Sequence, residues 1–363
     1  MYFEKSSDIP FLELASQTSE SRSWMVFVAE KSAAEVDLII EQCNAVKLPI
    51  FGGIFPAVIV DTKHFDSGIL MLSIPKVEAV ITLNETEESS EVFAHHADIS
   101  EIRTAFLFTD GLMGETDAFL RKVFNTFGNE LNIIGGGAGF MTLKQQPCIF
   151  TNAGVFQDGG VIALLKNTCK IGVKHGWDVL EGPFLATSTD KNCINELNWR
   201  PAFEVYQEVI ENNSDYRFTK DNFFEIAKSF PFGIHKEGTE IIVRDPFVVN
   251  EEKGILCLSE VPENSTLQIL HGNPSSLIAA AHSVALESID NDVYDTDLLL
   301  FDCISRVMFL GNQFEDELSA IQKHTPNGNA PLRGVATLGE IATAGNGFVE
   351  FFNKTIVACN LKN

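Results

Sequence analysis

Residues 105–137 read AFLFTDGLMGETDAFLRKVFNTFGNELNIIGGG. This stretch contains an apolar run that ends at Asp110, a helix-like segment over residues 118–127, and a second apolar run that ends in glycines. Short apolar runs on either side of a segment with helical periodicity predict two strands joined by a crossover helix, a unit of about 30 residues. We therefore expect a strand–helix–strand unit at this place in the chain.

The same layout occurs near each end of the chain. A first copy runs from residues 24–29 through a helix-like stretch to Gly53, and a third copy runs from residues 298–302 through residues 314–321 to Gly334. Agreement of several features in one order favours an internal duplication, and generic alternation of strands and helices is the alternative.

Each copy is followed by a further apolar segment, at residues 68–74, 150–156 and 351–357, and the last two segments carry Asn152 and Asn353. We interpret these segments as equivalent strands that continue the repeat.

The duplicated units predict an α/β (α+β) protein of two domains, built from mixed sheets packed with helices. Residues 200–228 have the pattern of one or two amphipathic helices, and Pro201 suits the first turn of a helix. We therefore divide the chain into an N-terminal extension (1–23), a first domain (24–198) and a second domain (199–363).

Composition narrows the class of protein. The chain has 26 Lys and Arg against 50 Asp and Glu, a net charge of −24, which disfavours binding to nucleic acid or to an anionic membrane surface. No apolar run is long enough to span a membrane. Seven isolated cysteines without a CxxC or CxxCH motif indicate reduced thiols in a cytoplasmic protein, without a structural metal site or covalent haem.

The glycine run over residues 135–139 (GGGAG) follows an apolar run, and consecutive glycines let a main chain approach a ligand closely. Because there is neither a GxxxxGK[ST] motif nor a GxGxxG that opens a helix, nucleotide binding is disfavoured. We expect a tight turn in which Gly136 and Gly137 form one wall of a ligand pocket. A purely structural turn is the alternative.

Several polar residues follow the predicted strands of the third copy, at the sheet edge where α/β proteins gather ligand contacts. Arg306 and Glu340, which follows Gly339, offer opposite charges, and Asn353 both donates and accepts hydrogen bonds. A surface charge or an ion pair between Glu340 and Arg306 is the alternative. Cys303 needs a nearby base to act as a nucleophile, and since no motif supplies one, a small pocket or core residue is favoured.

Two more residues are candidates. Arg244 ends an apolar run and is suited to bind a carboxylate in a bidentate manner, although a local pair with Asp245 is equally consistent. His175 lies beside Gly and Trp, where it is able to ligate a haem iron, but a hydrogen-bonded structural histidine is favoured. Because no catalytic set stands out, we expect a binding protein and no enzyme, metal or cofactor, and count Asp110 among the ligand-binding residues.

In their order and spacing these motifs resemble the FIST family of sensory proteins, over about residues 24–360. The first half is similar to the FIST N domain in the motifs DGL (110–112), IGGGAG (134–139), NAGVF (152–156) and HGW (175–177). RPAFEVY (200–206) is similar to the family's link into its second half. The second half is similar to the FIST C domain in PFGI (231–234), IIVRDP (241–246), Cys303 with Arg306, residues 315–318, GE (339–340) and NKT (353–355). Where the family often has a Gly-Cys-Ser/Thr-Thr-type turn, this chain has FGGIFP (51–56), so a more apolar pocket is expected there.

The resemblance implies an intracellular sensor of a small ligand, with amino acids proposed as ligands. Its partners would be histidine kinases of two-component systems, cyclic-di-GMP enzymes or chemotaxis proteins. One alternative is a b-type haem protein that senses nitric oxide, with His175 on the iron. Another is an enzyme with Cys303 as nucleophile. We expect the ligand beside the glycine run, with Arg244, Arg306 and Glu340 as anchors, and a signal passed to another chain.

Overall fold

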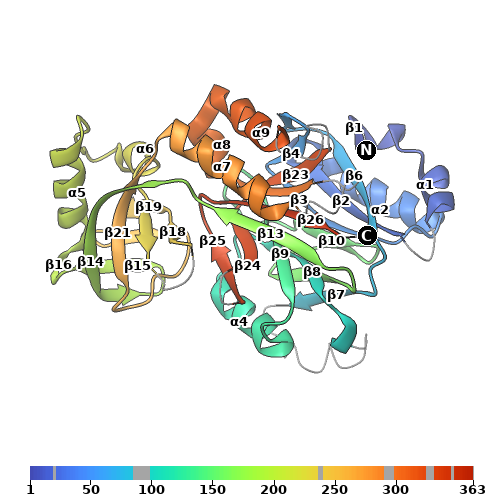
Figure 1. Cartoon of the computed structure of the whole chain (residues 1–363), viewed down its shortest axis with the longest axis horizontal. Helices are drawn as coiled ribbons and strands as arrows, with labels where there is room; N and C mark the ends of the chain where they lie inside the picture. Colours follow the sequence, from blue (N-terminus) through green and yellow to red (C-terminus); the bar gives the residue numbers. More distant parts are fainter. Residues whose placement is uncertain are drawn as a thin grey trace.

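A computed structural model describes residues 1–18, 22–84, 99–235, 240–289, 298–323, 331–344 and 347–362 (Figure 1). It confirms an α/β fold of mixed sheets packed with helices, with three six-stranded sheets and one eight-stranded sheet. Within the described residues, no helix has the length and apolar character needed to cross a membrane.

Three repeated units build the six-stranded sheets, and the predicted repeat is present in all three. The first unit consists of β2 (Arg22–Ala29), α2 (Val36–Ala45), β3 (Ile50–Phe55), β4 (Ala57–Val60), β5 (Lys63–Phe65) and β6 (Ile69–Pro75). The second consists of β8 (Thr104–Asp110), α4 (Thr116–Phe127), β9 (Asn132–Ala138), β10 (Ile149–Thr151), β11 (Gly154–Phe156) and β12 (Gly159–Leu165). The third consists of β22 (Leu298–Cys303), α8 (Ile304–Leu310), α9 (Phe314–Gln322), β23 (Leu332–Thr337), β24 (Glu340–Ala344), β25 (Phe348–Phe352) and β26 (Ile356–Leu361).

In every unit the first two strands are parallel, and the fifth strand pairs antiparallel with the first. The third and fourth strands of each unit form a hairpin, and this hairpin pairs with the second strand of a different unit. The β10–β11 hairpin extends the first unit at β3, β24–β25 extends the second at β9, and β4–β5 extends the third at β23. The three units therefore exchange hairpins in a closed ring.

One further strand edges each sheet: β1 (Tyr2–Phe3) beside β6, β7 (Ala79–Asn84) beside β12, and β13 (Cys169–Lys174) beside β26. Short helical elements among the described residues of the ring are α1 (Phe11–Gln17) and the 3₁₀ turns η1 (Ser6–Asp8), η2 (Glu30–Glu35), η3 (Ile99–Glu101) and η4 (Gly311–Gln313). Two of the three sheets contain strands from both sides of residue 199, so the predicted division there does not separate the sheets.

The prediction that the apolar segments at residues 68–74, 150–156 and 351–357 are equivalent strands is wrong. β10 is the first strand of its hairpin, residues 351–352 end the second strand of another, and β6 follows a hairpin. The first-unit equivalent of Gly135 and Gly334 is Gly52, because Gly52 pairs with Val26 as they pair with their own first strands. In each unit a hairpin stands between the second and the fifth strand. The three segments are apolar runs of similar length, so the sequence did not distinguish the strands of the hairpin from the fifth strand.

The units meet at a buried triad of phenylalanines. Phe27, Phe108 and Phe301 occupy the same position in the three first strands, and their ring centroids lie 5.3–6.2 Å apart. Helices cover the opposite faces, with α4 over the second unit and α9 over the third. With Phe51 and Phe55, which pack against the triad, these phenylalanines form an aromatic core at the centre of the ring.

A separate lobe is inserted between β13 and the third unit, and lies at one end of the molecule (Figure 1). Residues 178–271 form this lobe. Its elements are β14 (Asp178–Asp190), β15 (Cys193–Leu197), β16 (Arg200–Pro201), α5 (Ala202–Asn213), α6 (Phe223–Ala227), β17 (Phe232–Ile234), β18 (Ile242–Arg244), β19 (Pro246–Val249), β20 (Ile255–Cys257) and β21 (Thr266–His271). The helices predicted between residues 200 and 228 are confirmed as α5 and α6, and α7 (Pro274–Ser288) leads from the lobe to the ring.

Candidate functional site

Residues 135–138 of the glycine run, which was predicted as a turn, lie inside strand β9, and Gly139 follows its end. A Cβ on Gly136 would come 2.7 Å from Cγ2 of Thr337. The N–H of Gly137 donates to the carbonyl of Gly339 at 2.8 Å, and the N–H of Leu338 donates back to Gly137 at 2.9 Å. The glycines therefore admit the loop that follows β23, so the third unit fills the space beside them.

Asp110 is buried at the end of β8. One carboxylate oxygen accepts from the N–H of Leu112 at 3.0 Å, and the other accepts from the Gln145 amide at 2.7 Å and from the N–H of Asp158 at 3.1 Å. The carboxylate thus fixes the loops at this edge of the second unit.

Cys303 and Glu340 are brought together at the corresponding edge of the third unit. Glu340 is fully buried; its carboxyl contacts the Thr337 hydroxyl at 2.6 Å, the N–H of Thr355 at 3.2 Å and the Cys303 thiol. Burial raises the pKa of Glu340 to about 8, against the opposing effect of these hydrogen bonds. At neutral pH the group is therefore mostly a neutral acid.

Replacement of Glu340 by Gln is expected to stabilise the protein at pH 8–9 by a few kcal/mol. The folded-state pKa of Glu340 lies above the ordinary value of 4.5. Its contribution to stability is therefore complete below pH ~4.5 and is lost as pH rises through ~8. A glutamine amide preserves the contacts of the neutral acid with Thr337 and Thr355. Urea unfolding across pH 5–9 checks this, and equal slopes of stability against pH in both proteins would contradict it.

Arg306 is fully buried and all its donors are used within the protein. Its guanidinium binds Glu317 at 2.6 Å, lies 3.3 Å from Asp302, and donates to the main-chain carbonyls of His175, Lys354 and Leu277. Burial and the adjacent Glu317 raise the pKa of Asp302. A protonated Asp302 leaves one positive charge, on Arg306, and one negative charge, on Glu317, in this buried cluster. The ion pair between Arg306 and Glu340, which was the alternative to a ligand-binding role, is not formed.

The Cys303 thiol lies in an environment that opposes ionisation. It is buried, and burial together with the neighbouring Glu340 raises its pKa well above the ordinary value. A catalytic thiol needs the opposite shift. Of the seven cysteines, Cys193 is the most exposed.

We expect iodoacetamide to modify Cys193 first in the folded protein and to leave Cys303 unmodified, because modification requires an accessible thiolate. Peptide mapping by mass spectrometry measures this, with urea-unfolded protein, in which all seven thiols react, as the control. Labelling of Cys303 in the native protein at the rate of Cys193 would revive the enzyme alternative.

A buried polar network joins this cluster to the lobe. Asp245 accepts from the Ser305 hydroxyl at 3.0 Å and pairs with Lys354 at 3.1 Å. Asn353 accepts from the Ser259 hydroxyl at 3.2 Å. Asp245 therefore binds Lys354, and Arg244 is left without the carboxylate partner that the sequence offered.

Arg244 itself is held by main-chain carbonyls. It is 4% exposed, and its Nε and Nη1 donate to Glu260 at 2.7 Å, to Phe351 at 3.0 Å and to Val243 at 3.2 Å. In the described part of the chain, its Nη2 has no hydrogen-bond partner. A fixed guanidinium with unused donors is suited to bind an anion.

Arg244 lines a cavity of about 410 Å³ between α4, β25 and the lobe. This volume lies in the range of ligand pockets, roughly 300–1,000 Å³. Half of its lining is apolar and half is polar or charged: Leu120, Phe124, Ile234, Pro262, Phe348 and Val349, with Asp117, Arg121, Asn125, Arg244, Glu260 and Glu350.

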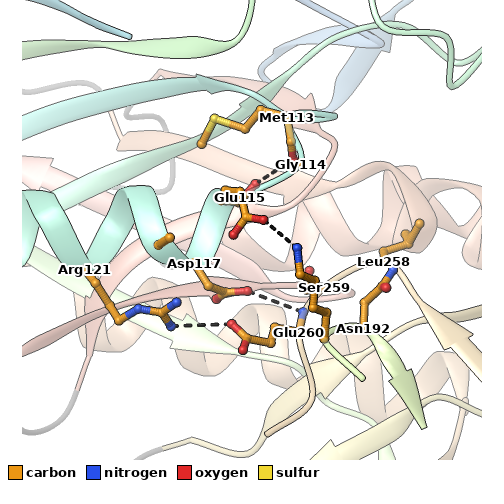
Figure 2. A pocket seen from close by; sticks show the side chains of 12 residues that line it. Met113, Gly114, Glu115, Asp117, Arg121, Asn192, Leu258, Ser259 and Glu260 are labelled. Atoms are coloured by element: carbon orange, nitrogen blue, oxygen red, sulfur yellow. Dashed lines mark hydrogen bonds and ion pairs between the residues drawn. The ribbon is translucent and has the colours of Figure 1, made fainter. Parts of the chain in front are cut away.

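A smaller cavity of about 190 Å³ adjoins it, sharing Asp117, Arg121 and Glu260, and includes Ser259 in its lining (Figure 2). Figure 2 shows Arg121 pointing from α4 to Glu260 of the lobe, 3.4 Å apart, and the N–H of Glu260 donating to Asp117 at 3.3 Å. Lys191 and Glu115 bridge the same junction at 2.8 Å. These contacts tie the lobe to the second unit around the cavities.

His175 does not fit an axial haem ligand. It is 7% exposed; its Nδ1 accepts from the N–H of Trp177 at 2.9 Å and its Nε2 lies 3.4 Å from Glu240. Both ring nitrogens are thus occupied within the protein, and burial lowers the pKa of His175 to about 4. Across the described ranges, His, Cys, Asp and Glu form no group of three able to hold a metal ion.

Sequence reasoning missed most residues of the larger cavity. Asp117, Arg121 and Phe124 lie on an amphipathic helix, where charged residues are ordinary on the outer face. Only the position of the lobe against α4 makes them a site, and the sequence carries no periodic signal of that contact.

Comparison with protein-family models gives two matches. The model described as the FIST N domain matches residues 23–200, and the model described as the FIST C domain matches residues 202–343. A search of curated proteins found no match.

Proposed function

The chain belongs to the FIST family, and from this premise we propose that it is a sensor that binds a small carboxylate-bearing ligand and signals through a separate protein. FIST domains are associated with sensing and signal transduction. The observation that supports a ligand of this kind is the 410 Å³ cavity, which is lined by Arg244, the arginine whose Nη2 has unused donors.

Both ends of an amino acid find complementary groups in this cavity. Arg244 is suited to the carboxylate, and Asp117 is suited to an ammonium group, since Glu260 already faces Arg121. Arg306 and Glu340, by contrast, are buried in contacts with protein groups. We therefore place the ligand at Arg244, with an amino acid or a related metabolite as the ligand.

The partner in this proposal is a histidine kinase, a cyclic-di-GMP enzyme or a chemotaxis protein, and the compartment is the cytoplasm. Seven free cysteines agree with a reducing compartment. Because the cavity lies where the lobe meets the ring, a ligand that prefers one arrangement of the two would shift their equilibrium.

Native mass spectrometry of freshly purified protein, followed by a thermal-shift screen of amino acids and other carboxylates, tests the proposal. A ligand at ~100 times its dissociation constant adds about 2.7 kcal/mol of stability. Arg244→Lys keeps the charge and removes the forked donors, so affinity is expected to fall about tenfold or more. Arg200→Lys, in an exposed ion pair outside the cavity, is the control. Unchanged affinity in a folded Arg244→Lys variant would refute the site.

A further inference from the structure

Resting on the ligand-sensing function proposed above, we propose that the larger cavity selects an α-amino acid with a large apolar side chain, aromatic or branched aliphatic. The selection comes from the division of the cavity into an apolar wall and a charged wall.

The apolar wall is built around a stacked aromatic pair. The rings of Phe124 and Phe348 lie 4.8 Å apart at an interplanar angle of 27°, and Leu120, Ile234 and Val349 line the same cavity. Phe348 is 52% exposed on edge strand β25. An apolar side chain placed here would remove this surface from water, which favours binding.

The charged wall has room for one carboxylate. Its cations are Arg121 and Arg244, and Arg121 already faces Glu260 at 3.4 Å. Its acids are Asp117, Glu260 and Glu350, so acids outnumber bases three to two. One carboxylate at Arg244 and one ammonium group near Asp117 match this pattern.

Other classes of amino acid fit less well. Of the described residues that line the cavity, only Arg121 and Arg244 are cations, and Arg121 already faces Glu260, so a second carboxylate, as in glutamate, would meet no further cation among them. A basic side chain would find an acid but leave the apolar wall uncovered. Serine is too small to reach across a cavity of about 410 Å³.

Calorimetric titration of the full chain with L-phenylalanine, L-leucine, L-serine, L-glutamate and L-lysine tests the selection. We expect phenylalanine and leucine to bind about tenfold or more tightly than the others. Removing one anchor, as in 3-phenylpropanoate (no ammonium) or 2-phenylethylamine (no carboxylate), is expected to weaken binding about tenfold each.

Three variants test whether the apolar wall, and not only the fold, determines binding. Phe348→Ala is expected to weaken phenylalanine binding about fivefold or more, as loss of apolar contact does. Val80→Ala, which alters a 42% exposed residue on edge strand β7 of the same sheet, is the matched control. Asn125→Trp would fill the cavity from its exposed rim and abolish binding.

The outcomes distinguish this inference from the function on which it rests. Tightest binding of glutamate, lysine or serine, lost in Arg244→Lys, would overturn the selectivity and keep the sensor. Binding of none of the five probes would overturn the selectivity outright, and with an empty screen of other carboxylates it would remove the proposed site too.

Discussion

Replacement of Arg306 by Met is expected to destabilise the protein by about 5 kcal/mol or more, a large share of the ~5–15 kcal/mol that holds a typical protein folded. Methionine keeps the apolar stem but leaves Glu317 as a buried charge without its partner, a loss of about 3–5 kcal/mol. The carbonyl of His175 also loses its donor, and an orphaned buried acceptor costs about 1–3 kcal/mol. Urea unfolding followed by circular dichroism measures the change.

Two comparisons make the Arg306 result specific. Removing the charges together, in Asp302→Asn, Arg306→Met and Glu317→Gln, is expected to recover part of the loss, because the unpaired charge is gone. Arg200→Met breaks an exposed pair with Glu208 at 2.7 Å, for which we expect a change of ~1 kcal/mol or less. Equal effects of Arg306→Met and Arg200→Met would contradict the argument.

Replacement of Gly52 by Ala is expected to abolish the folded, soluble protein. The added Cβ would lie 1.7 Å from the main-chain oxygen of Val26 on the adjacent parallel strand, far inside the ~3.3 Å at which carbon and oxygen meet. Strands β2 and β3 would have to separate at the centre of the ring, beside Phe27. Soluble yield and the far-UV circular dichroism spectrum report the outcome.

Gly114→Ala is the matched control, since a Cβ there meets nothing within 4 Å. It is expected to be neutral or stabilising by about 0.4–1 kcal/mol. Gly334→Ala, at the equivalent place in the third unit, places its Cβ 1.9 Å from the Leu300 oxygen and should behave like Gly52→Ala. A folded Gly52→Ala protein with an unchanged midpoint would show that the strand pair can adjust.

The sequence predicted the units to within a few residues because each buried strand is a short uninterrupted apolar run beside an amphipathic helix, as at β8 and α4. It did not predict the hairpin exchange, since the pairing of Ala57 with Ala336 joins residues too distant for any periodicity to connect. The eight-stranded lobe was also missed. Most of its strands are short, and the long β14 mixes exposed and half-buried residues without strict alternation.

The polar residues were found more easily than their roles. Placement of Cys303 and Glu340 at one sheet edge followed from the strand ends, and the structure brings them together. Which arginine has donors to spare did not follow from sequence. Arg306 is paired with Asp302 and Glu317, whereas Asp245 is paired with Lys354 and leaves Arg244 without a carboxylate. Lys354 lies far from Asp245 along the chain, so no local sequence pattern indicates that pairing.

The exchange of hairpins also sets a condition on biosynthesis. The β4–β5 hairpin leaves the ribosome long before its partner β23 is made. Until then the nascent chain carries an unpaired edge, of the kind that recruits other chains. The ring therefore cannot close until residues 332–337 have been made, and such long-range pairing makes for slow folding. This protein should depend on chaperones during synthesis more than a chain of its size with sequential units.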